Sequence, residues 1–512
     1  MNRKQIILAI SLFILASFVA GTGMTYYLNA EGRSASSDNT IQQLGKFSRI
    51  FSIVKNNYVF EENSDSLITS AIRGMLKSLD PHSIYMDKNL YNDLMIMTQG
   101  KFGGIGIQIS TSDGYPVVIA PIEGTPAYKL GIIAGDKITK IENEDTHNKS
   151  LESIVSKLRG IPGTKVHITI QRVGIKDPIN YTIVRDYIKV RSVPYATTLD
   201  SHYVYIRLTN FSQTASPEVG KALDSLVNGT TKGIILDLRF NPGGLITEAQ
   251  KVAGYFLPRN STVVSTRGRM SGIDKVYRTI NFKTYTDIPM TVLVDRGSAS
   301  ASEIVSGAIQ DWDRGLIIGD TTYGKGSVQT VFPLGPKEAL KLTTARYYTP
   351  SGRCIDKELR GDTIVDTFTT IGGLSRLITS AGGIIPDVVI PYRKLSSTEI
   401  QLAKDNMYFK FSASYCAGKK DKLKDTYKMN SNVWNAFKHY VAKEDTSISM
   451  EKLDKNKTNI EGTLNSYISR ILWGEKGWYR ATFKTDLQLK KALEVLKKTK
   501  NVKDIFKEIA GN

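Results

Sequence analysis

Residues 292–310 read V-L-V-D-R-G-S-A-S-A-S-E-I-V-S-G-A-I-Q and decide how the middle of the chain folds. An apolar run ends at Asp295, small residues follow, and a second apolar stretch with helical spacing begins at Ala301. This order predicts a buried strand, a tight turn and a helix. Because a helix start exposes backbone N–H groups and the positive end of the helix dipole, we expect the turn to favour negative charge.

Ser300 lies in that turn, and two interpretations are open. A serine at such a turn can attack a carbonyl carbon while a neighbouring N–H stabilises the oxyanion. Ser300 followed three residues later by Glu303 also fits a capping box, in which the serine only caps the helix. Taken alone, the segment favours the helix cap.

A second loop, residues 320–329, reads D-T-T-Y-G-K-G-S-V-Q and follows another apolar run. A lysine in a loop is usually solvated, but one held among apolar groups can lose its proton because desolvation disfavours the charge. A neutral amine at Lys325 would be a competent base for a serine hydroxyl, and Gln329 could orient it. The loop lacks the G-x-x-x-x-G-K-[ST] spacing of a phosphate loop.

A third loop, Asn241-Pro242-Gly243-Gly244, lies between an expected strand and an expected helix. A turn before a helix is enough to explain its glycines. The functional interpretation is a second set of N–H donors for an oxyanion, because α/β sheets place their sites at the carboxyl ends of strands.

Strands and helices alternate from about residue 187 to 391, which predicts βαβ crossovers and a largely parallel sheet. The expected strands are Tyr203–Leu208, Gly233–Leu238, Met290–Val294 and Leu316–Ile318. The expected helices are Pro217–Val227, Ile246–Phe256 and Ala301–Trp312. Short strands with Gly and Pro punctuation are expected from about 100 to 185, and amphipathic helices from 41 to 97.

The composition is that of an ordinary globular protein of 512 residues, with 41% apolar and 23% charged residues. Two cysteines are too few for a disulfide-built scaffold. The sequence contains no H-E-x-x-H motif and no closely spaced cysteine pair that would suggest a metal site. The net charge of +19 leaves nucleic acid, an anionic membrane or solubility as explanations. Residues 401–512 carry 23 Lys and Arg against 13 Asp and Glu, in a helical pattern typical of a solvated face.

The N-terminus has Arg3 and Lys4 before an apolar run, Ile6 to Leu28. At ~1.5 Å rise per residue, this run is long enough to span a ~30 Å hydrocarbon core, and the positive flank places that end in the cytoplasm. A cleaved signal peptide is the competing interpretation. Both predict that the rest of the chain is exported.

Five stretches together resemble the carboxyl-terminal processing peptidases, also called tail-specific proteases, which are Ser/Lys endopeptidases. They are residues 236–244 (L-D-L-R-F-N-P-G-G), 297–310, 319–329, 342–352 (L-T-T-A-R-Y-Y-T-P-S-G) and 383–388 (G-I-I-P-D-V). The resemblance runs from about residue 41 to 395. It implies an α/β multidomain chain: a crotonase-like or ClpP-like βαβ peptidase core, an inserted PDZ domain, a helical N-terminal unit and a helical C-terminal extension.

The resemblance implies roles for particular residues. The nucleophile falls on Ser300, the general base on Lys325 and the base-orienting residue on Gln329. The oxyanion donors would be the N–H groups of Ala301 and of Gly243 or Gly244, and Glu303 resembles a supporting carboxylate. No metal or organic cofactor is implied.

The resemblance also identifies a PDZ domain from residues 102–107 (F-G-G-I-G-I) and 131–138 (G-I-I-A-G-D-K-I). The N–H groups around Gly104, Ile105, Gly106 and Ile107 can hold a terminal carboxylate, and the following strand can accept the peptide as an added strand. Residues 150–158 would line that groove as a helix. Arg159 matches a position that links the PDZ domain to the active site in some relatives, and a surface salt bridge is the alternative.

The resulting prediction is an exported serine endopeptidase that recognises exposed C-terminal tails of proteins and needs no cofactor. The alternatives are a non-catalytic PDZ scaffold on a peptidase fold and a nucleic-acid-binding protein, of which the second is disfavoured. We expect attachment to the cell membrane with the catalytic region on the periplasmic side, or secretion to the periplasm after signal cleavage. A homodimer is consistent with the family.

The predicted divisions are an anchor or signal at 1–30, a linker at 31–40, the helical unit at 41–98, the PDZ domain at 99–186, the peptidase core at 187–395 and the basic helical extension at 396–512.

Overall fold

The computed structural model describes residues 37–281, 283–357, 366–380 and 382–508. The chain divides into two compact units, residues 1–85 and 86–512. The expected membrane segment, Ile6 to Leu28, lies outside the described residues. Within the described ranges, none of the helices combines the length and the apolar composition that crossing a membrane requires.

The described part of the first unit contains two helices, α2 (Ser37–Asn57) and α3 (Ser64–Lys77). Helix α3 begins at Asn63, whose side chain accepts hydrogen bonds from the N–H groups of Asp65 and Ser66. Helix α2 has the predicted apolar residues at helical spacing, and these side chains are exposed: Ile41, Leu44, Phe47, Ile50, Ile53 and Val54.

Helix α4 (Lys88–Gln99) belongs to the second unit, although its periodicity suggested that it continues the N-terminal helical unit. Asp87 caps its start, and Gly100 ends it with a φ of 67°. The carbonyl of Thr98 accepts a hydrogen bond of 2.9 Å from the Gln213 N–H, which ties the helix to the peptidase part of the unit.

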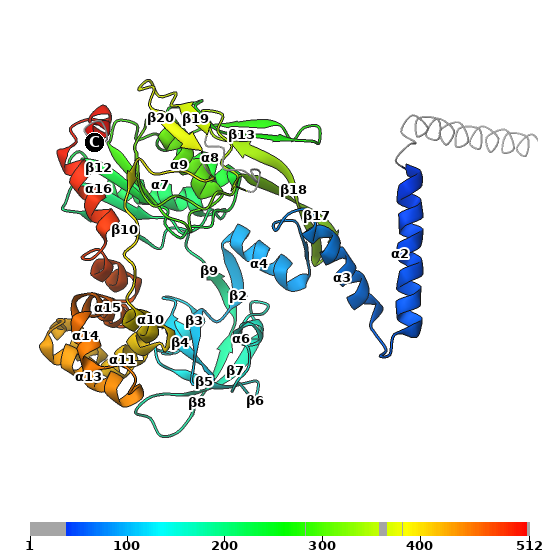
Figure 1. Ribbon diagram of the computed structural model, residues 1–512. Coiled ribbons are helices and arrows are strands. Elements are labelled where there is room, and N and C mark those ends of the chain that lie inside the picture. Colours follow the sequence, from blue (N-terminus) through cyan, green and yellow to red (C-terminus); the bar gives the residue numbers. More distant parts are fainter. Residues whose placement is uncertain (1–36, 282, 358–365, 381, 509–512) are drawn as a thin grey trace, which may run out of the picture. The chain divides into compact units, whose positions relative to one another are not determined.

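A six-stranded sheet forms the core of the peptidase part of the second unit, where β10 and β12 are labelled in Figure 1. Its strand order is β10-β11-β12-β15-β16-β21, and every pair is parallel except the antiparallel β10–β11 edge pair. The strands are β10 (Tyr195–Leu199), β11 (Tyr203–Arg207), β12 (Gly233–Asp237), β15 (Met290–Val294), β16 (Leu316–Gly319) and β21 (Val388–Val389). The predicted, largely parallel βαβ sheet is therefore present.

Each face of this sheet packs on helices, which explains why its strands are apolar throughout. One face, with Ile234 and Leu236, packs on the crossover helices α7 (Ala215–Leu226), α8 (Ile246–Ala253) and α9 (Ala301–Asp311). The opposite face, with Ile235 and Leu293, packs on α16 (Leu487–Lys498), drawn in red in Figure 1. The C-terminal helix α16 is thus part of the peptidase core.

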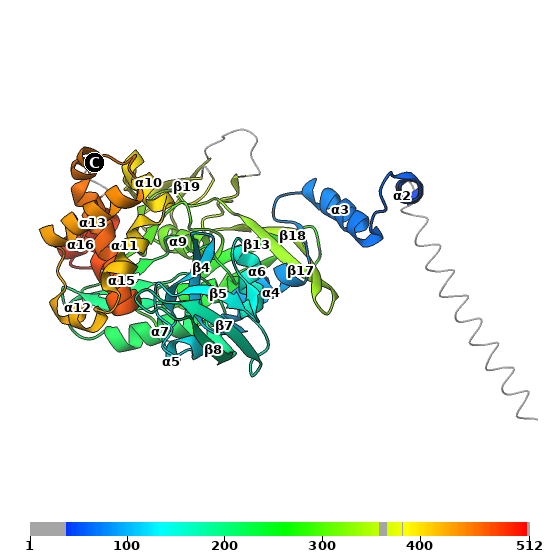
Figure 2. The ribbon, with the colours of Figure 1, turned by 90° about the horizontal axis from the view of Figure 1, so that it is seen from below.

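A β-rich domain is inserted before the central sheet. Its entry and exit strands, β2 (Lys101–Gly104) and β9 (Asp186–Lys189), pair antiparallel, so the chain enters and leaves at one place. Between them, a sheet in the order β3-β4-β5-β7-β8 packs with α6 (Leu151–Leu158), which Ser150 caps. Figure 2 shows β5, β7 and β8 side by side. The remaining bounds are β3 (Ile107–Ser112), β4 (Tyr115–Pro121), β5 (Lys137–Ile141), β6 (Glu144–Asp145), β7 (Lys165–Gln171), β8 (Ile179–Val184) and α5 (Pro126–Lys129).

A second, antiparallel sheet extends from the core. The long hairpin β17 (Ser327–Gly335) and β18 (Glu338–Tyr348) begins two residues after Lys325. Strand β18 also pairs with β13 (Thr262–Gly268), which pairs with β14 (Lys275–Arg278). A small separate pair consists of β19 (Asp366–Thr369) and β20 (Leu377–Ser380).

The C-terminal extension forms a helical bundle with its own apolar core. Its longest helix, α15 (Lys457–Thr482), is interrupted at Gly474, which has a φ of 65°. The other helices of the bundle are α10 (Ser397–Lys404), α11 (Met407–Cys416), α12 (Lys420–Thr426), α13 (Ser431–Glu444) and α14 (Met450–Lys455). The final 3-10 helix η2 (Val502–Glu508) packs with α16 on the central sheet.

Candidate active site

Ser300 lies at the turn between β15 and α9, at the carboxyl edge of the parallel sheet. Its backbone has φ 54° and ψ −113°, a conformation that residues with a side chain rarely adopt. A helix-capping serine normally has extended backbone angles instead, although the predicted capping box of Ser300 and Glu303 is also present at the start of α9. A strained serine between a strand and a helix is typical of nucleophiles, whose hydroxyl must project from the turn.

Glu303 joins the Ser300 turn to the Lys325 loop. Its Oε2 accepts hydrogen bonds from the N–H of Ser300 at 2.8 Å and from the N–H of Lys325 at 3.0 Å. Its Oε1 accepts from the Thr322 hydroxyl at 2.6 Å and from the Gly324 N–H at 2.7 Å. The carboxylate therefore fixes the backbone of both predicted catalytic residues at once.

The Glu303 side chain is fully buried, and this burial dominates its protonation. Burial raises the pKa of Glu303 to about 7, although its hydrogen bonds from Thr322, Gly324, Lys325 and Ser300 all favour the charged form. All four partners are donors, so protonation near neutral pH would remove an acceptor from one of them.

Tyr347, which the sequence reasoning did not single out, lies beneath the same two loops. Its buried hydroxyl donates to the carbonyl of Lys325 and, at 3.3 Å, to the carbonyl of Ser300. Its own N–H donates to the carbonyl of Gly326. The residue falls within the quoted stretch 342–352, but no local pattern distinguishes it from the neighbouring Tyr348.

Gln329 lies in β17, four residues beyond Lys325. Its Nε2 donates to the hydroxyls of Ser327 at 3.0 Å and Thr343 at 3.2 Å. These bonds fix the amide plane, and the amide Oε1 is the atom that could accept a hydrogen bond from the Lys325 amine.

The Asn241–Gly244 loop lies directly against the Ser300 turn. A Cβ added to Gly243 would stand 2.8 Å from Cβ of Ser300 and 2.9 Å from the Ala301 nitrogen. The Gly243 N–H already donates to Asn241 Oδ1. Among the described residues, the N–H groups of Gly244 and Ala301 have no hydrogen-bond partner. Of the two predicted glycines, Gly244 therefore has the donor that an oxyanion could use.

The predicted carboxylate-binding loop connects β2 to β3. Gly104, Ile105 and Gly106 are buried, and Gly106 has a φ of 82°. Within the described part of the chain, the N–H groups of Ile105 and Gly106 lack a hydrogen-bond partner. Ile107 begins β3, which is an edge strand because it pairs only with β4. The loop thus offers N–H donors beside a strand that pairs on one side only, as a peptide C-terminus requires. The C-terminal bundle also contacts this strand, since Asn406 donates to the carbonyl of Thr111 and Arg470 donates to Gln108.

Arg159 lies at the end of α6 and ion-pairs with Asp93 of α4 at 2.7 Å. Its guanidinium also lies over the Phe102 ring. Both charged side chains are partly exposed, at 36% and 56%. The structure thus places Arg159 in a surface salt bridge, which was the alternative to a link with the active site.

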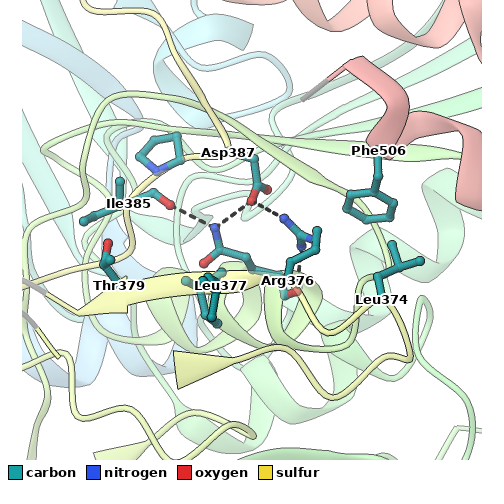
Figure 3. Close-up of a pocket in the computed structure, with 10 residues that line it drawn as sticks. Leu374, Arg376, Leu377, Thr379, Ile385, Asp387 and Phe506 are labelled. Atoms are coloured by element: carbon teal, nitrogen blue, oxygen red, sulfur yellow. Dashed lines mark hydrogen bonds and ion pairs between the residues drawn. The ribbon is translucent and has the colours of Figure 1, made fainter. Parts of the chain in front are cut away.

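A separate cavity of about 520 Å³ lies at the far end of α9, around Gln310 (Figure 3). Ten residues of helix, ~15 Å, separate Gln310 from Ser300. Arg376 in this cavity is bound by Asp313 and Asp387, and Figure 3 shows the pair with Asp387. The charged and amide side chains that line the cavity, Gln310, Arg376 and Asp387, bind one another.

Comparison with known proteins gives three matches along the chain. Residues 202–365 match the Peptidase family S41, and residues 117–172 match the PDZ domain. Residues 6–90 match the family described as the activating protease CtpB N-terminal domain.

The similar proteins are named as C-terminal processing proteases. The carboxy-terminal-processing protease of Bartonella bacilliformis is 42% identical over 346 residues, which is 66% of this chain and 79% of that one. The carboxy-terminal processing protease CtpA of Bacillus subtilis is 33% identical over 351 residues, covering 67% of this chain and 74% of that one. A solved photosystem II D1 C-terminal processing protease is 26% identical, with a TM-score of 0.38, over 67% of this chain and 92% of that chain.

The fold and these matches define a serine peptidase that carries a PDZ domain. The chain belongs to the carboxy-terminal processing proteases of peptidase family S41. The predicted family, α/β fold class and enzymatic activity are therefore confirmed, and its substrates are peptides or proteins recognised at the C-terminus. The roles of individual residues, the domain boundaries and the cellular location stay predictions.

Proposed function

We propose that Ser300 is the nucleophile and Lys325 the general base of this peptidase. The observation that carries the assignment is the buried Glu303 carboxylate, which binds the N–H groups of both residues. A single rigid group thus sets the separation of the two loops, as a dyad requires.

In the proposed reaction, Ser300 Oγ attacks the scissile carbonyl carbon while the neutral Lys325 amine takes its proton. The N–H groups of Ala301 and Gly244 stabilise the oxyanion. The Lys325 ammonium then protonates the leaving amine. Water next attacks the acyl-enzyme while Lys325 accepts a proton from the water. The Lys325 ammonium then returns this proton to Ser300 Oγ as the carboxylic product leaves, which restores the free enzyme. Gln329 orients the Lys325 amine.

The test is cleavage of a loosely folded protein with an exposed tail by the full-length chain. We expect Ser300→Ala and Lys325→Ala each to abolish cleavage while the thermal unfolding transition remains. Ser225→Ala in α7 and Lys422→Ala in α12 are matched controls and should keep full activity. Substantial cleavage by either loop variant would exclude the assignment.

The PDZ part of the proposal is that the carboxylate of a substrate tail binds the N–H groups of Ile105 and Gly106. The tail then pairs with β3 on the side that has no strand partner, beside α6. A labelled tail peptide should bind the Ser300→Ala chain, and the same peptide with an amidated C-terminus should bind at least tenfold more weakly. Equal affinity for the two peptides would contradict the proposal.

We also propose that the N-terminal segment attaches the chain to the cell membrane, with the catalytic region on the periplasmic side. The support is the sequence alone: Arg3 and Lys4 precede the uncharged run Ile6 to Leu28. Secretion after signal cleavage is the alternative. Protease added to intact spheroplasts should degrade the catalytic region, and the protein should stay in the membrane fraction. Recovery in the soluble periplasmic fraction would favour cleavage instead.

A homodimer is the last part of the proposal, supported by the exposed apolar side chains of α2, among them Leu44, Phe47 and Ile50. Such a stripe normally packs on another surface. Sedimentation of residues 31–512 should show a dimer that Phe47→Asp weakens. A monomer at all concentrations would contradict this part.

A further inference from the structure

The C-terminal extension reaches the loop that borders Ser300, and it does so through one arginine. Arg239 follows β12 and begins the loop that ends at Gly244. It is only 7% exposed. Its neighbours in space include Asp486 and Gln488, which lie more than 240 residues later in the chain, at the start of α16.

Every N–H of the Arg239 guanidinium is used. Nε and Nη2 donate to the two oxygens of Asp237 at 3.0 and 2.6 Å. Nη1 donates to Asp486 Oδ1 at 3.0 Å and to Gln488 Oε1 at 3.1 Å, and Nη2 donates to Asp486 Oδ2 at 2.7 Å. Three of the five donors are therefore satisfied by the extension.

The extension holds these acceptors rigidly. Asp486 caps α16 by accepting a hydrogen bond from the Leu489 N–H at 3.0 Å. Gln488 is 2% exposed, and its Nε2 donates to the carbonyl of Ile390 at 2.7 Å. The apolar face of α16 is buried against the sheet. The acceptors for Arg239 are thus fixed before any substrate binds.

Charge balance makes Asp486 more than a helix cap. Asp237 is already paired with Arg207 at 2.6 Å and bonded by the Tyr205 hydroxyl. The charge of Arg239 is therefore balanced by Asp486. Without that carboxylate, the buried group of two arginines and one aspartate would carry an uncompensated positive charge, which is costly at low exposure.

Asn241 lies two residues after Arg239 along the chain, and its contacts reach the turn of the nucleophile. The carbonyl of Asn241 accepts hydrogen bonds from the Ala299 N–H at 3.0 Å and from the Ser302 hydroxyl at 2.8 Å. The next glycine, Gly243, lies against Ser300 itself. A movement of Arg239 would therefore displace both N–H donors of the proposed oxyanion site, Gly244 in the loop and Ala301 in the serine turn.

We propose that Asp486 and Gln488 are positioning residues of the peptidase, which hold Arg239 and through it the oxyanion loop. The proposal rests on the assignment of Ser300 and Gly244 given above. It assigns to the end of the C-terminal extension a part in catalysis, in addition to its packing on the sheet.

The test uses the full-length chain with Asp486→Asn, which keeps the size of the side chain but removes its charge. We expect kcat to fall about tenfold or more, because the loop loses its alignment with the transition state, and KM to change less than twofold. Affinity for a tail peptide should stay unchanged. Asp486→Glu should recover part of kcat. Asp421→Asn, in the exposed part of α12, is the matched control and should behave as the native chain.

A double-mutant cycle separates positioning from simple stability. If Asp486 acts through Arg239, then Asp486→Asn should lower kcat far less in an Arg239→Lys background than in the native one. Gln488→Ala is the milder second variant should Asp486→Asn fold poorly, and it should lower kcat at least threefold. Native kcat in both variants, or additive effects in the cycle, would overturn the proposal while Ser300→Ala remained inactive. Activity in Ser300→Ala would instead refute the assignment of the site itself.

Discussion

The PDZ loop and the peptidase site use the same device, a glycine turn that presents backbone N–H groups to an anion. In the PDZ loop the donors are Ile105 and Gly106, and Gly106 has a φ of 82°. At the peptidase site they are Gly244 and Ala301, and Gly244 has a φ of 146°. Either pair could hold a negatively charged oxygen.

The two sites differ in what holds the turn. Neutral groups fix the PDZ loop: the carbonyl of Gly106 accepts hydrogen bonds from the Ile122 N–H and the Thr125 hydroxyl. Buried charges fix the peptidase site, chiefly Glu303 and Arg239. A tail carboxylate is charged before it binds and can tolerate some adjustment. An oxyanion exists only in the transition state and the short-lived tetrahedral intermediate, so its hydrogen-bond donors must be aligned before the reaction.

The largest expected effect comes from Gly244→Ala. The new Cβ would stand 2.4 Å from the carbonyl oxygen of Phe211, so the loop must shift and its N–H would move away from the oxyanion. Removal of one oxyanion donor costs about 10²–10³-fold in kcat. Steady-state cleavage should show that loss with unchanged tail-peptide affinity. Gly229→Ala, which meets no atom within 4 Å, is the control. A kcat within threefold of native would remove Gly244 from the site.

Glu303→Gln should have the next largest effect. An amide offers one acceptor atom and presents N–H groups to partners that are themselves donors, so two of the four hydrogen bonds are lost. At about 1–1.5 kcal/mol for each of the two lost bonds, kcat should fall about 30–150-fold. The measurement is kcat at saturating substrate, with the exposed Glu451→Gln as control. If KM rose instead of kcat falling, Glu303 would serve binding and the contrast between the two sites would fail.

The same carboxyl predicts a pH dependence of stability. The folded-state pKa of Glu303 is raised to about 7 by burial, from 4.5 when unfolded, so the folded protein binds the proton more tightly. Its contribution to stability is therefore fully present below about pH 4.5 and is lost as pH rises to 7. We expect urea unfolding to show that, between pH 5 and pH 8, the free energy of unfolding of the native chain falls by about 2–3 kcal/mol more than that of Glu303→Gln. Parallel pH profiles of the two chains would show that Glu303 titrates normally.

Local patterns predicted the peptidase strands and helices because each is a short apolar stretch with its own punctuation. The predicted strand Met290–Val294 matches β15, and the predicted helix from Ala301 matches the start of α9. The serine turn and the Lys325 loop could be found because each lies next to such a stretch. Nothing local could show that Tyr347, in a strand beyond the Lys325 loop, places its hydroxyl under both.

The sequence predicts the helices of the C-terminal region but not the surface on which they pack. A charged helix with apolar residues every three or four positions is typical of a solvated surface helix, and α16 carries that pattern. Its apolar face packs on the sheet through Leu489 and Leu496, which the helical period alone cannot reveal because it does not name the partner surface. The contact of Asp486 with Arg239 depends on this packing, so the sequence alone could not predict it.

Gly106→Ala tests the PDZ side of the comparison and should have a smaller effect. A Cβ at Gly106 would stand 2.3 Å from the Thr125 side chain, and a φ of 82° disfavours any side chain. We expect KM for a tailed substrate to rise about fivefold with kcat unchanged, since neutral contacts allow the loop to adjust. Gly174→Ala has a similar φ with nothing within 4 Å and controls for backbone strain. A fall in kcat at saturating substrate would mean that the PDZ loop also aligns the catalytic groups.

The smallest effect is expected from the ion pair of Arg159 and Asp93, which joins α6 to α4. Exposed pairs contribute about 0.2–1 kcal/mol, so Arg159→Gln and Asp93→Asn should each lower the free energy of unfolding by no more than that and change kcat less than twofold. Both variants remove this ion pair, and Arg159→Gln also removes the contact of the guanidinium with the Phe102 ring, so its effect on stability should be equal or slightly larger. If Arg159→Gln alone lowered kcat tenfold, the arginine would have a second partner in the substrate-bound enzyme. The PDZ domain would then control the peptidase site, and the two regions would not act independently.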